Sequence, residues 1–286
     1  MRKNMEQRPY GALNIVAQPH PVGVYRRIFD AAALLTSGAR FHGDNFARIS
    51  RLADDDRGFL KGRLAIWTEI DPREPVINKA TLDQSILSDS DLSFQSEIGF
   101  NSRVFNFIFR EQKHEVVVEL RNDLGSSISI GRAKLAFQKI FQYVKVEGVD
   151  DISVHAKSAH DAVDRVLDLD TLRKIRIHLQ IPNPDDLSEA TAAIMAEIDQ
   201  LNTKVIDTEL TKRAGPDGLK LNDRYKAMAE IAKDNGFVSS EGMNEVGEKE
   251  TRSTKDTPDV FSQQFLENET SYSALRRAAE ARDGRQ

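Results

Sequence analysis

The chain has 286 residues, which suits one large domain or two small ones. Its hydrophobic content of 40% and charged content of 30% are typical of a soluble globular protein. The formal net charge of -5 argues against binding polyanions over the whole surface, but it leaves room for local basic faces. Cysteine is absent, which excludes disulfides, cysteine-based zinc sites, iron–sulfur clusters and thiol catalysis.

The start of the sequence indicates a soluble, cytoplasmic protein without membrane contact. Residues 1–9 are charged and are predicted to be a disordered start, and no apolar run follows them as in a signal peptide. The longest apolar stretch nearby, residues 31–35, is far shorter than the roughly 20 residues that cross a membrane.

The first predicted elements are a strand, a helix and two further strands. Residues 11–17 form a short apolar run, and apolar residues at helical spacing follow between Pro21 and Leu35. Residues 41–52 are strand-like, and an acidic turn at residues 54–58 leads into the next strand.

Residues 59–70 are the most regular stretch of the chain, because they alternate between two faces as a strand does. One face is apolar and is predicted to face the core. The opposite face combines cations with the only tryptophan of the chain: Lys61, Arg63 and Trp67.

After a connector at residues 71–97, a hairpin is predicted over residues 104–121. Helices and strands then alternate. The predicted helices are residues 127–144, 160–169, 187–201 and 221–233, the strands are 151–157, 172–181 and 204–211, and a polar hairpin covers 237–254. A helix at 273–282 has a thin apolar face, so it is expected to need a partner to order it.

These elements predict an α+β fold with mainly antiparallel sheet and helices on one face. The preferred version has two ferredoxin-like halves in tandem, over residues 10–97 and 98–258, followed by a charged tail at 259–286. One continuous sheet shared by both halves is the alternative.

Two strand faces are candidates for nucleic-acid binding, since cations contact phosphates and aromatic rings stack on bases. The first face consists of Lys61, Arg63 and Trp67 with Arg48, and the second of Lys174, Arg176 and His178. The hydroxyl-rich segment 251–258 adds Arg252 and Lys255. The plainer interpretation is an ordinary solvated strand face, with Trp67 packed under a neighbouring layer and the cations covering its edge.

No catalytic motif is present. His42, His155 and His178 are the candidates for a general base, and His42 is followed closely by Asp44 as an orienting carboxylate. No histidine pair has the helical spacing with an intervening glutamate that a zinc hydrolase requires, so no metal or cofactor is predicted.

Four short segments together resemble a known family. They are Trp-Thr-Glu-Ile-Asp at 67–71, Pro-Asn-Pro-Asp-Asp-Leu-Ser at 182–188, Asn-Gly-Phe-Val at 235–238, and Ser-Thr-Lys-Asp at 253–256 before Pro258. Their order is similar to an uncharacterised bacterial family, the domain of unknown function numbered 4747. The resemblance implies no activity, cofactor or catalytic residue. Its members are associated with mobile or defence genes, which favours a nucleic-acid or phage-related role.

Three functions follow from these observations. The preferred one is a non-enzymatic protein that binds RNA or single-stranded DNA in phage defence or mobile-element biology. The first alternative is a nuclease on the same basic faces. The second alternative is a subunit of a homo-oligomer or hetero-oligomer, assembled through the strand faces or the C-terminal tail.

Overall fold

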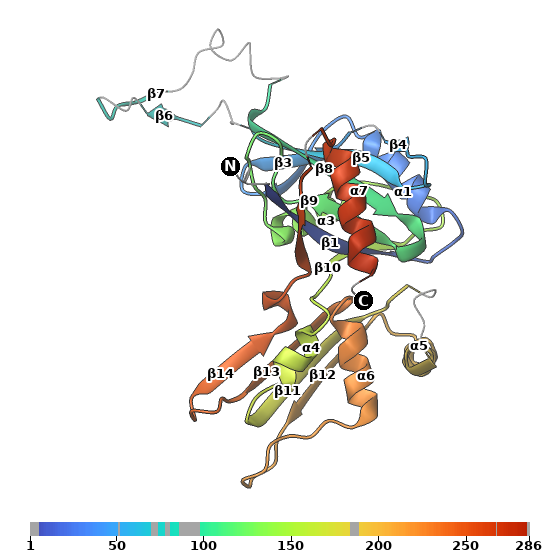
Figure 1. Ribbon diagram of the computed structural model, residues 1–286, viewed down its shortest axis with the longest axis vertical. Helices are drawn as coiled ribbons and strands as arrows, with labels where there is room; N and C mark the ends of the chain where they lie inside the picture. The colour runs from blue at the N-terminus through green and yellow to red at the C-terminus, as the bar shows by residue number, and fades with distance from the viewer. Residues whose placement is uncertain are drawn as a thin grey trace.

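The computed structural model describes residues 6–50, 52–69, 74–77, 81–85, 98–183, 189–266 and 268–284. Its two lobes are built on two antiparallel sheets of nine and four strands (Figure 1). A separate pair of short strands consists of β6 (Val76–Ile77) and β7 (Gln84–Ser85). The predicted α+β fold with antiparallel sheets is confirmed, whereas two ferredoxin-like halves are not.

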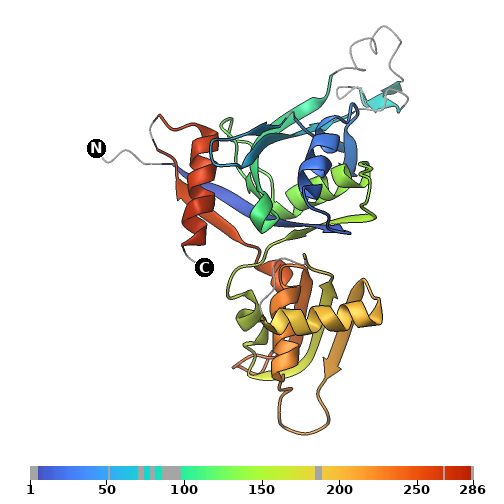
Figure 2. The same ribbon diagram turned by 90° about the vertical axis from the view of Figure 1, so that its right-hand side faces the viewer.

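The nine-stranded sheet curls into a half-barrel (Figure 2). Its strands, in spatial order, are β10 (Asp151–Ala156), β1 (Gln7–Gln18), β9 (Glu115–Glu119), β8 (Phe100–Arg110), β5 (Leu60–Thr68), β3 (Asn45–Ile49) and β2 (Ala39–His42). In addition, β15 (Val260–Gln264) pairs with β1, and β4 (Ala53–Asp54) pairs with β5. The short 3-10 helix η1 (Glu111–Lys113) joins β8 to β9.

Helices α1 (Val24–Ala33) and α3 (Ile130–Gln142) pack on the inner face of this sheet and build the main core with it. The strand predicted at 59–70 is present as β5, and the alternation holds: Leu60, Leu64 and Ile66 are buried in that core. Alternation locates the core face because successive side chains of a strand point to opposite sides of the sheet.

Helix α7 (Ser271–Asp283) lies on the opposite face of the same sheet. Its Leu275, Ala278 and Ala279 are buried against residues of β1, β8 and β9, namely Tyr10, Ile108 and Val117. The helix predicted in the tail is therefore present, and the surface that orders it is the chain's own sheet.

The four-stranded sheet has the order β12 (Val205–Thr211), β11 (Thr171–Gln180), β13 (Gly236–Met243) and β14 (Lys249–Ser253). Helices α4 (Ala162–Leu167), α5 (Glu189–Leu201) and α6 (Asp223–Ala232) supply the apolar side chains that cover one face. Ile175, Ile177 and Leu179 of β11 point into this second core. The alternate residues of β11 therefore lie on the face without helices.

The structure differs from two predictions about the domain organisation. The boundary expected near residue 97 falls inside the nine-stranded sheet, because β5 pairs with β8 across it. Residues 7–9 are not a disordered start, because they belong to β1 and pair with β15, with Gln7 opposite Gln264. Residues 1–5 of that start lie outside the described residues.

The two lobes meet through polar contacts. Asn14 of β1 donates its side-chain amide to the backbone oxygen of Asp234, at 3.3 Å, and to Oδ1 of Asn235, at 2.9 Å. The Tyr25 hydroxyl donates to Oδ1 of the fully buried Asn183 at 2.7 Å, and Asn183 donates to the Ile15 oxygen at 2.9 Å. No helix in the described part of the chain is both long and apolar enough to cross a membrane.

Candidate nucleic-acid interface

The two basic faces predicted from the sequence lie in different sheets. Lys61, Arg63 and Trp67 belong to β5 of the nine-stranded sheet, with Arg48 on the adjacent β3. Lys174 and Arg176 belong to β11 of the four-stranded sheet. The structure therefore does not join the two faces into one continuous sheet surface.

On the first face, Trp67 is partly exposed but packed closely against its neighbours. A Cβ atom placed on Gly99 would lie 2.2 Å from Trp67 Cδ1, and one on Gly38 would lie 2.4 Å from Cζ2. The indole thus packs directly on both glycines, stacks on Phe46 with centroids 6.4 Å apart, and donates Nε1–H to Glu69 Oε1 at 3.0 Å. These contacts agree with the plainer interpretation, in which Trp67 packs against a neighbouring part of the chain.

The cations beside Trp67 differ in their surroundings. Lys61 Nζ lies 5.9 Å from the ring centroid of Tyr272, which belongs to α7, so the helix partly covers it. Arg48 Nη1 donates to the Thr36 backbone oxygen at 3.4 Å. Arg63 is exposed. This face therefore offers scattered cations beside a ring that is already packed against its neighbours.

The second face carries a partly exposed aromatic ring that was not selected from the sequence, Phe237. It lies at the start of the central strand β13, opposite His178 of β11, and the two rings stack with centroids 5.1 Å apart. Lys255 Nζ lies 3.5 Å from the Phe237 centroid, and Arg176 Cζ lies 5.7 Å from it. The signal in the sequence was its place before the buried Val238, which sets Phe237 on the face without helices.

Carboxylates on the same face neutralise part of this charge. Asp207 accepts two hydrogen bonds from Arg176, at 2.9 and 2.6 Å, and its Oδ2 lies 3.1 Å from His178 Nδ1. The bonds from Arg176 and then His178 hold the pKa of Asp207 well below its usual range. Lys174 pairs with Glu209 at 2.9 Å. The part of this face around Lys174 and Arg176 therefore carries both positive and negative charges.

The other lobe adds a lysine and a histidine at the end of β11 and β13 nearest to it. These are Lys134 of α3 and the buried His155 of β10. Burial and then the charge of Lys134 lower the pKa of His155 to about 4, with His178 as a further contribution. Burial and then Lys255 lower the pKa of Lys134. These mutual effects place the basic groups of both lobes within electrostatic reach of one another.

We name the group Lys134, His155, Arg176, His178 and Lys255 the junction cluster; three of its members, Arg176, His178 and Lys255, lie around the ring of Phe237. Burial and then Arg176 also lower the pKa of Lys255. Among the described residues, neither Lys134 nor Lys255 forms an ion pair with a carboxylate. Two lysines without matching carboxylates favour an anion, because each cation raises the energy of the other.

Arg252 and His42 lie away from this cluster. Arg252 is opposite the buried Ser240 and donates to the backbone oxygen of Arg165 in α4, at 2.9 Å, so it lies on the helix side of the sheet. His42 is at the exposed end of β2. Asp44, its expected orienting carboxylate, pairs instead with Arg40 at 2.7 Å.

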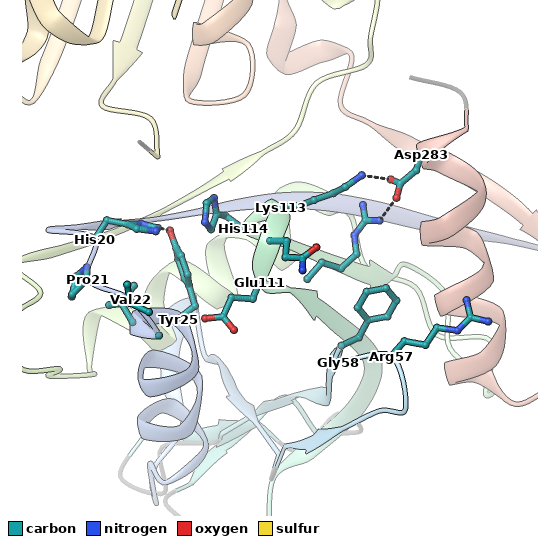
Figure 3. A pocket seen from close by; sticks show the side chains of 15 residues that line it. His20, Pro21, Val22, Tyr25, Arg57, Gly58, Glu111, Lys113, His114 and Asp283 are labelled. Atoms are coloured by element: carbon teal, nitrogen blue, oxygen red, sulfur yellow. Dashed lines mark hydrogen bonds and ion pairs between the residues drawn. The ribbon is translucent and has the colours of Figure 1, made fainter. Parts of the chain in front are cut away.

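A cavity of about 680 Å³ lies between the start of α1, η1 and the end of α7 (Figure 3). Four of its charged groups are already paired: Asp283 contacts Arg110 and Lys113, both at 2.8 Å, and Arg57 contacts Glu280. None of the residues selected from the sequence lines it. Within the described ranges, no group of three or more histidine, aspartate or glutamate side chains is placed to hold a metal ion.

Comparison with known proteins gives one family match. A model described as a domain of unknown function (DUF4747) matches residues 8–280, which includes all strands of both sheets except the first residue of β1. No curated protein matches the chain.

Proposed function

This chain belongs to the DUF4747 family, and we propose that it binds single-stranded nucleic acid, RNA or DNA, without catalysis. The proposed interface is the end of the four-stranded sheet that carries the junction cluster. The observation that supports it most is the Phe237 ring on a central strand, with Lys255, Arg176 and His178 around it.

The geometry suits a nucleotide chain because one base and its phosphates have complementary partners. Stacking of a base on an aromatic side chain contributes roughly 1–3 kcal/mol and tolerates any sequence. Lys255 lies over the ring, 3.5 Å from its centroid, so a stacked base would displace it towards the phosphates, and Arg176 lies 5.7 Å from the same centroid. Lys134 extends the positive charge onto the other lobe.

The stacking contribution is tested with Phe237→Ala. We expect it to weaken binding of a fluorescent single strand of about 10 nucleotides by about tenfold or more, measured by anisotropy. Tyr143→Ala is the matched control, since Tyr143 is a 60% exposed aromatic at the end of α3, away from the cluster. Equal affinity of the Phe237→Ala variant and the unchanged protein would contradict the proposed interface.

The phosphate contribution is tested by the dependence of affinity on salt. Lys255→Gln and Lys134→Gln should each reduce the slope of log K against log salt by about 0.7, the value for one phosphate contact with a single strand. Lys145→Gln, which removes an exposed lysine outside the cluster, should leave the slope unchanged. Unaltered slopes in both cluster variants would remove the electrostatic basis of the proposal.

A nuclease is the second candidate, because His178 is held by Asp207 at 3.1 Å next to Arg176. A histidine oriented by a carboxylate is suited to general base catalysis. His155 is less suited, since its pKa of about 4 makes it a weak base. Cleavage of RNA or DNA that disappears in His178→Ala would support this candidate. Intact substrate after incubation with Mg²⁺, Mn²⁺ or chelator would dismiss it.

The biological setting in phage defence or mobile elements stays a prediction, and so does assembly into an oligomer. Light scattering separates the third function from the first two. A molar mass that stays at one chain at all concentrations would count against an assembly subunit, whereas a stable multiple of it would support one.

A further inference from the structure

A second basic site lies away from the junction cluster, in a cavity of about 200 Å³. It is formed where β2, β3 and β8 meet the start of α3. Its polar lining consists of His42, Asn45, Arg103, Ser127, Ser129 and Arg132. Among the residues that the structure describes, no carboxylate lines it, and the apolar side chains of the half-barrel complete the wall.

The two arginines of this cavity have unused hydrogen-bonding capacity. Arg103 Nε is buried without a hydrogen-bond partner, and its Nη2 reaches Asn45 Oδ1 at the long distance of 3.4 Å. Arg132 is exposed in the first turn of α3. In the described part of the chain, neither arginine forms an ion pair with a carboxylate. The guanidinium groups therefore remain available to an anion.

The end of α3 at the cavity adds to this positive potential. The Ser129 side chain caps the helix by accepting from the Arg132 backbone N–H at 3.3 Å, and the first turn contains no acidic residue. The N-terminus of a helix carries partial positive charge, which a carboxylate in the first turn commonly offsets. Here the arginines reinforce that charge.

Two other cavities in the described part of the chain lack this character. In the 680 Å³ cavity, Asp283 already neutralises Arg110 and Lys113. In another of about 170 Å³, Arg282 is paired with Asp259. The cavity beside α3 differs from both because the charged side chains that line it are all positive.

We propose that the cavity beside α3 binds a phosphate group, either as inorganic phosphate or as the end of a phosphomonoester. Arginine guanidinium groups match the geometry of phosphate oxygens, and the serine and asparagine side chains supply further donors. A volume of about 200 Å³ is below the roughly 300–1,000 Å³ of sites that enclose whole small molecules, so the phosphate group alone occupies it. His42, proposed from the sequence as a base, lies at this site as a phosphate contact.

The test is titration calorimetry of the full chain with inorganic phosphate. We expect binding to one site, weakened about tenfold or more in both Arg132→Gln and Arg103→Gln, as for the loss of a charge-assisted hydrogen bond. Arg132 is exposed, so its variant is expected to fold, and a thermal melt verifies this. Lys139→Gln, on the same helix but outside the cavity, is the matched control.

Two further titrations identify the source of the phosphate. Uridine 5′-monophosphate binding more tightly than inorganic phosphate, with no binding of uridine, would assign a phosphomonoester, and the reverse order would assign the free ion. Phe237→Ala should leave phosphate affinity unchanged, which separates this site from the proposed nucleic-acid interface. Absence of phosphate binding, or arginine variants that bind phosphate as tightly as the unchanged protein, would overturn the proposal.

Discussion

Two buried side chains of the nine-stranded sheet, His155 and Glu119, have pKa values displaced in opposite directions. Burial, followed by Lys134 and His178, lowers the pKa of His155 to about 4 from 6.5. Burial raises the pKa of Glu119 to about 7 from 4.5, although the backbone and side chain of Asn106 donate hydrogen bonds to it. Both groups are therefore favoured in their neutral forms, and both affect stability in the weakly acidic range.

The signs of the two effects oppose each other. The stability from neutral His155 is fully present above pH 6.5 and is lost as the pH falls towards about 4. The stability from neutral Glu119 is fully present below pH 4.5 and is lost as the pH rises through about 7. Between about pH 7 and about pH 5, the two contributions each change by about 2 kcal/mol and largely cancel.

Single substitutions should reveal this cancellation. Relative to the unchanged protein, His155→Gln should gain about 2 kcal/mol of unfolding free energy when the pH falls from about 7 to about 5. Glu119→Gln should lose a similar amount over the same interval. Urea denaturation at both pH values measures these changes. If the two variants follow the pH profile of the unchanged protein, the burial of these groups does not govern their ionisation.

The contact of Trp67 with Gly99 makes a second prediction at the residue scale. In Gly99→Ala, the new Cβ would lie 2.2 to 2.7 Å from Trp67 Cδ1, Cγ and Cβ, which are near the root of the side chain and cannot move cheaply. We expect a loss of about 1–3 kcal/mol of unfolding free energy. Gly131→Ala is the control, because nothing lies within 4 Å of its Cβ position and alanine favours a helix. Comparable stability of the two variants would mean that Trp67 is not confined.

At the scale of elements, α7 is held to the sheet by a buried ionic network as well as by its small apolar face. Glu115 of β9 is fully buried and contacts Arg282 of α7 and Arg110 of β8. Burial raises the pKa of Glu115, but the charges of Lys157, Arg282 and Arg110 outweigh burial and bring it below its usual value. Asp259 also pairs with Arg282. Helix α7 therefore supplies, through Arg282, a buried positive partner for Glu115 and Asp259.

Removing Arg282 should be far more damaging than removing a less buried arginine of the same helix. Arg282→Met deprives Glu115 and Asp259 of a buried partner, and we expect a loss of about 3–5 kcal/mol of unfolding free energy. Arg276→Gln removes the more exposed pair with Asp56 and should cost less than about 1 kcal/mol. Chemical denaturation compares the two, and equal losses would show that the buried network adds nothing specific.

Periodicity predicted most of the helices and strands, but not those that depend on pairing or packing with a distant segment. The alternation of Ile175, Ile177 and Leu179 was a sufficient signal for β11, because one face of that strand is buried. Strand β15 was missed, since Val-Phe-Ser-Gln-Gln has little apolar alternation and is stabilised by pairing with β1. The apolar face of α7 appeared too thin because alanines contribute to a core only where a partner surface approaches closely.

At the scale of the whole molecule, the junction cluster depends on how the lobes meet. Lys134 and His155 come from one lobe, and Arg176, His178 and Lys255 come from the other. The buried Asn183 links Tyr25 and the backbone of Ile15 to the chain that leaves β11. Polar contacts of this kind fix orientation, because each needs a partner in one direction.

A substitution that weakens the contact between the two lobes should therefore reduce nucleic-acid affinity, even though the substituted residue does not contact the ligand. We expect Asn183→Ala to lower unfolding free energy by about 1–3 kcal/mol, because it leaves buried polar groups unmatched. It should also reduce affinity for single strands several-fold. Asn222→Ala, which removes the cap of α6 inside one lobe, is the control with a similar stability loss of about 1 kcal/mol. Unchanged affinity in Asn183→Ala would mean that the lobes act separately.

By itself, the sequence determined the core faces, the positions of most helices and strands, and the absence of cysteine chemistry, since these depend on composition and on local spacing. It also placed Lys174, Arg176 and His178 on one face of β11. Only the tertiary structure decided that Trp67 is packed, that Phe237 is partly exposed, and that Lys134 and His155 join the second face. The reason is physical: alternation is a property of one strand, whereas neighbours are chosen by pairing between distant residues, as between Gln7 and Gln264.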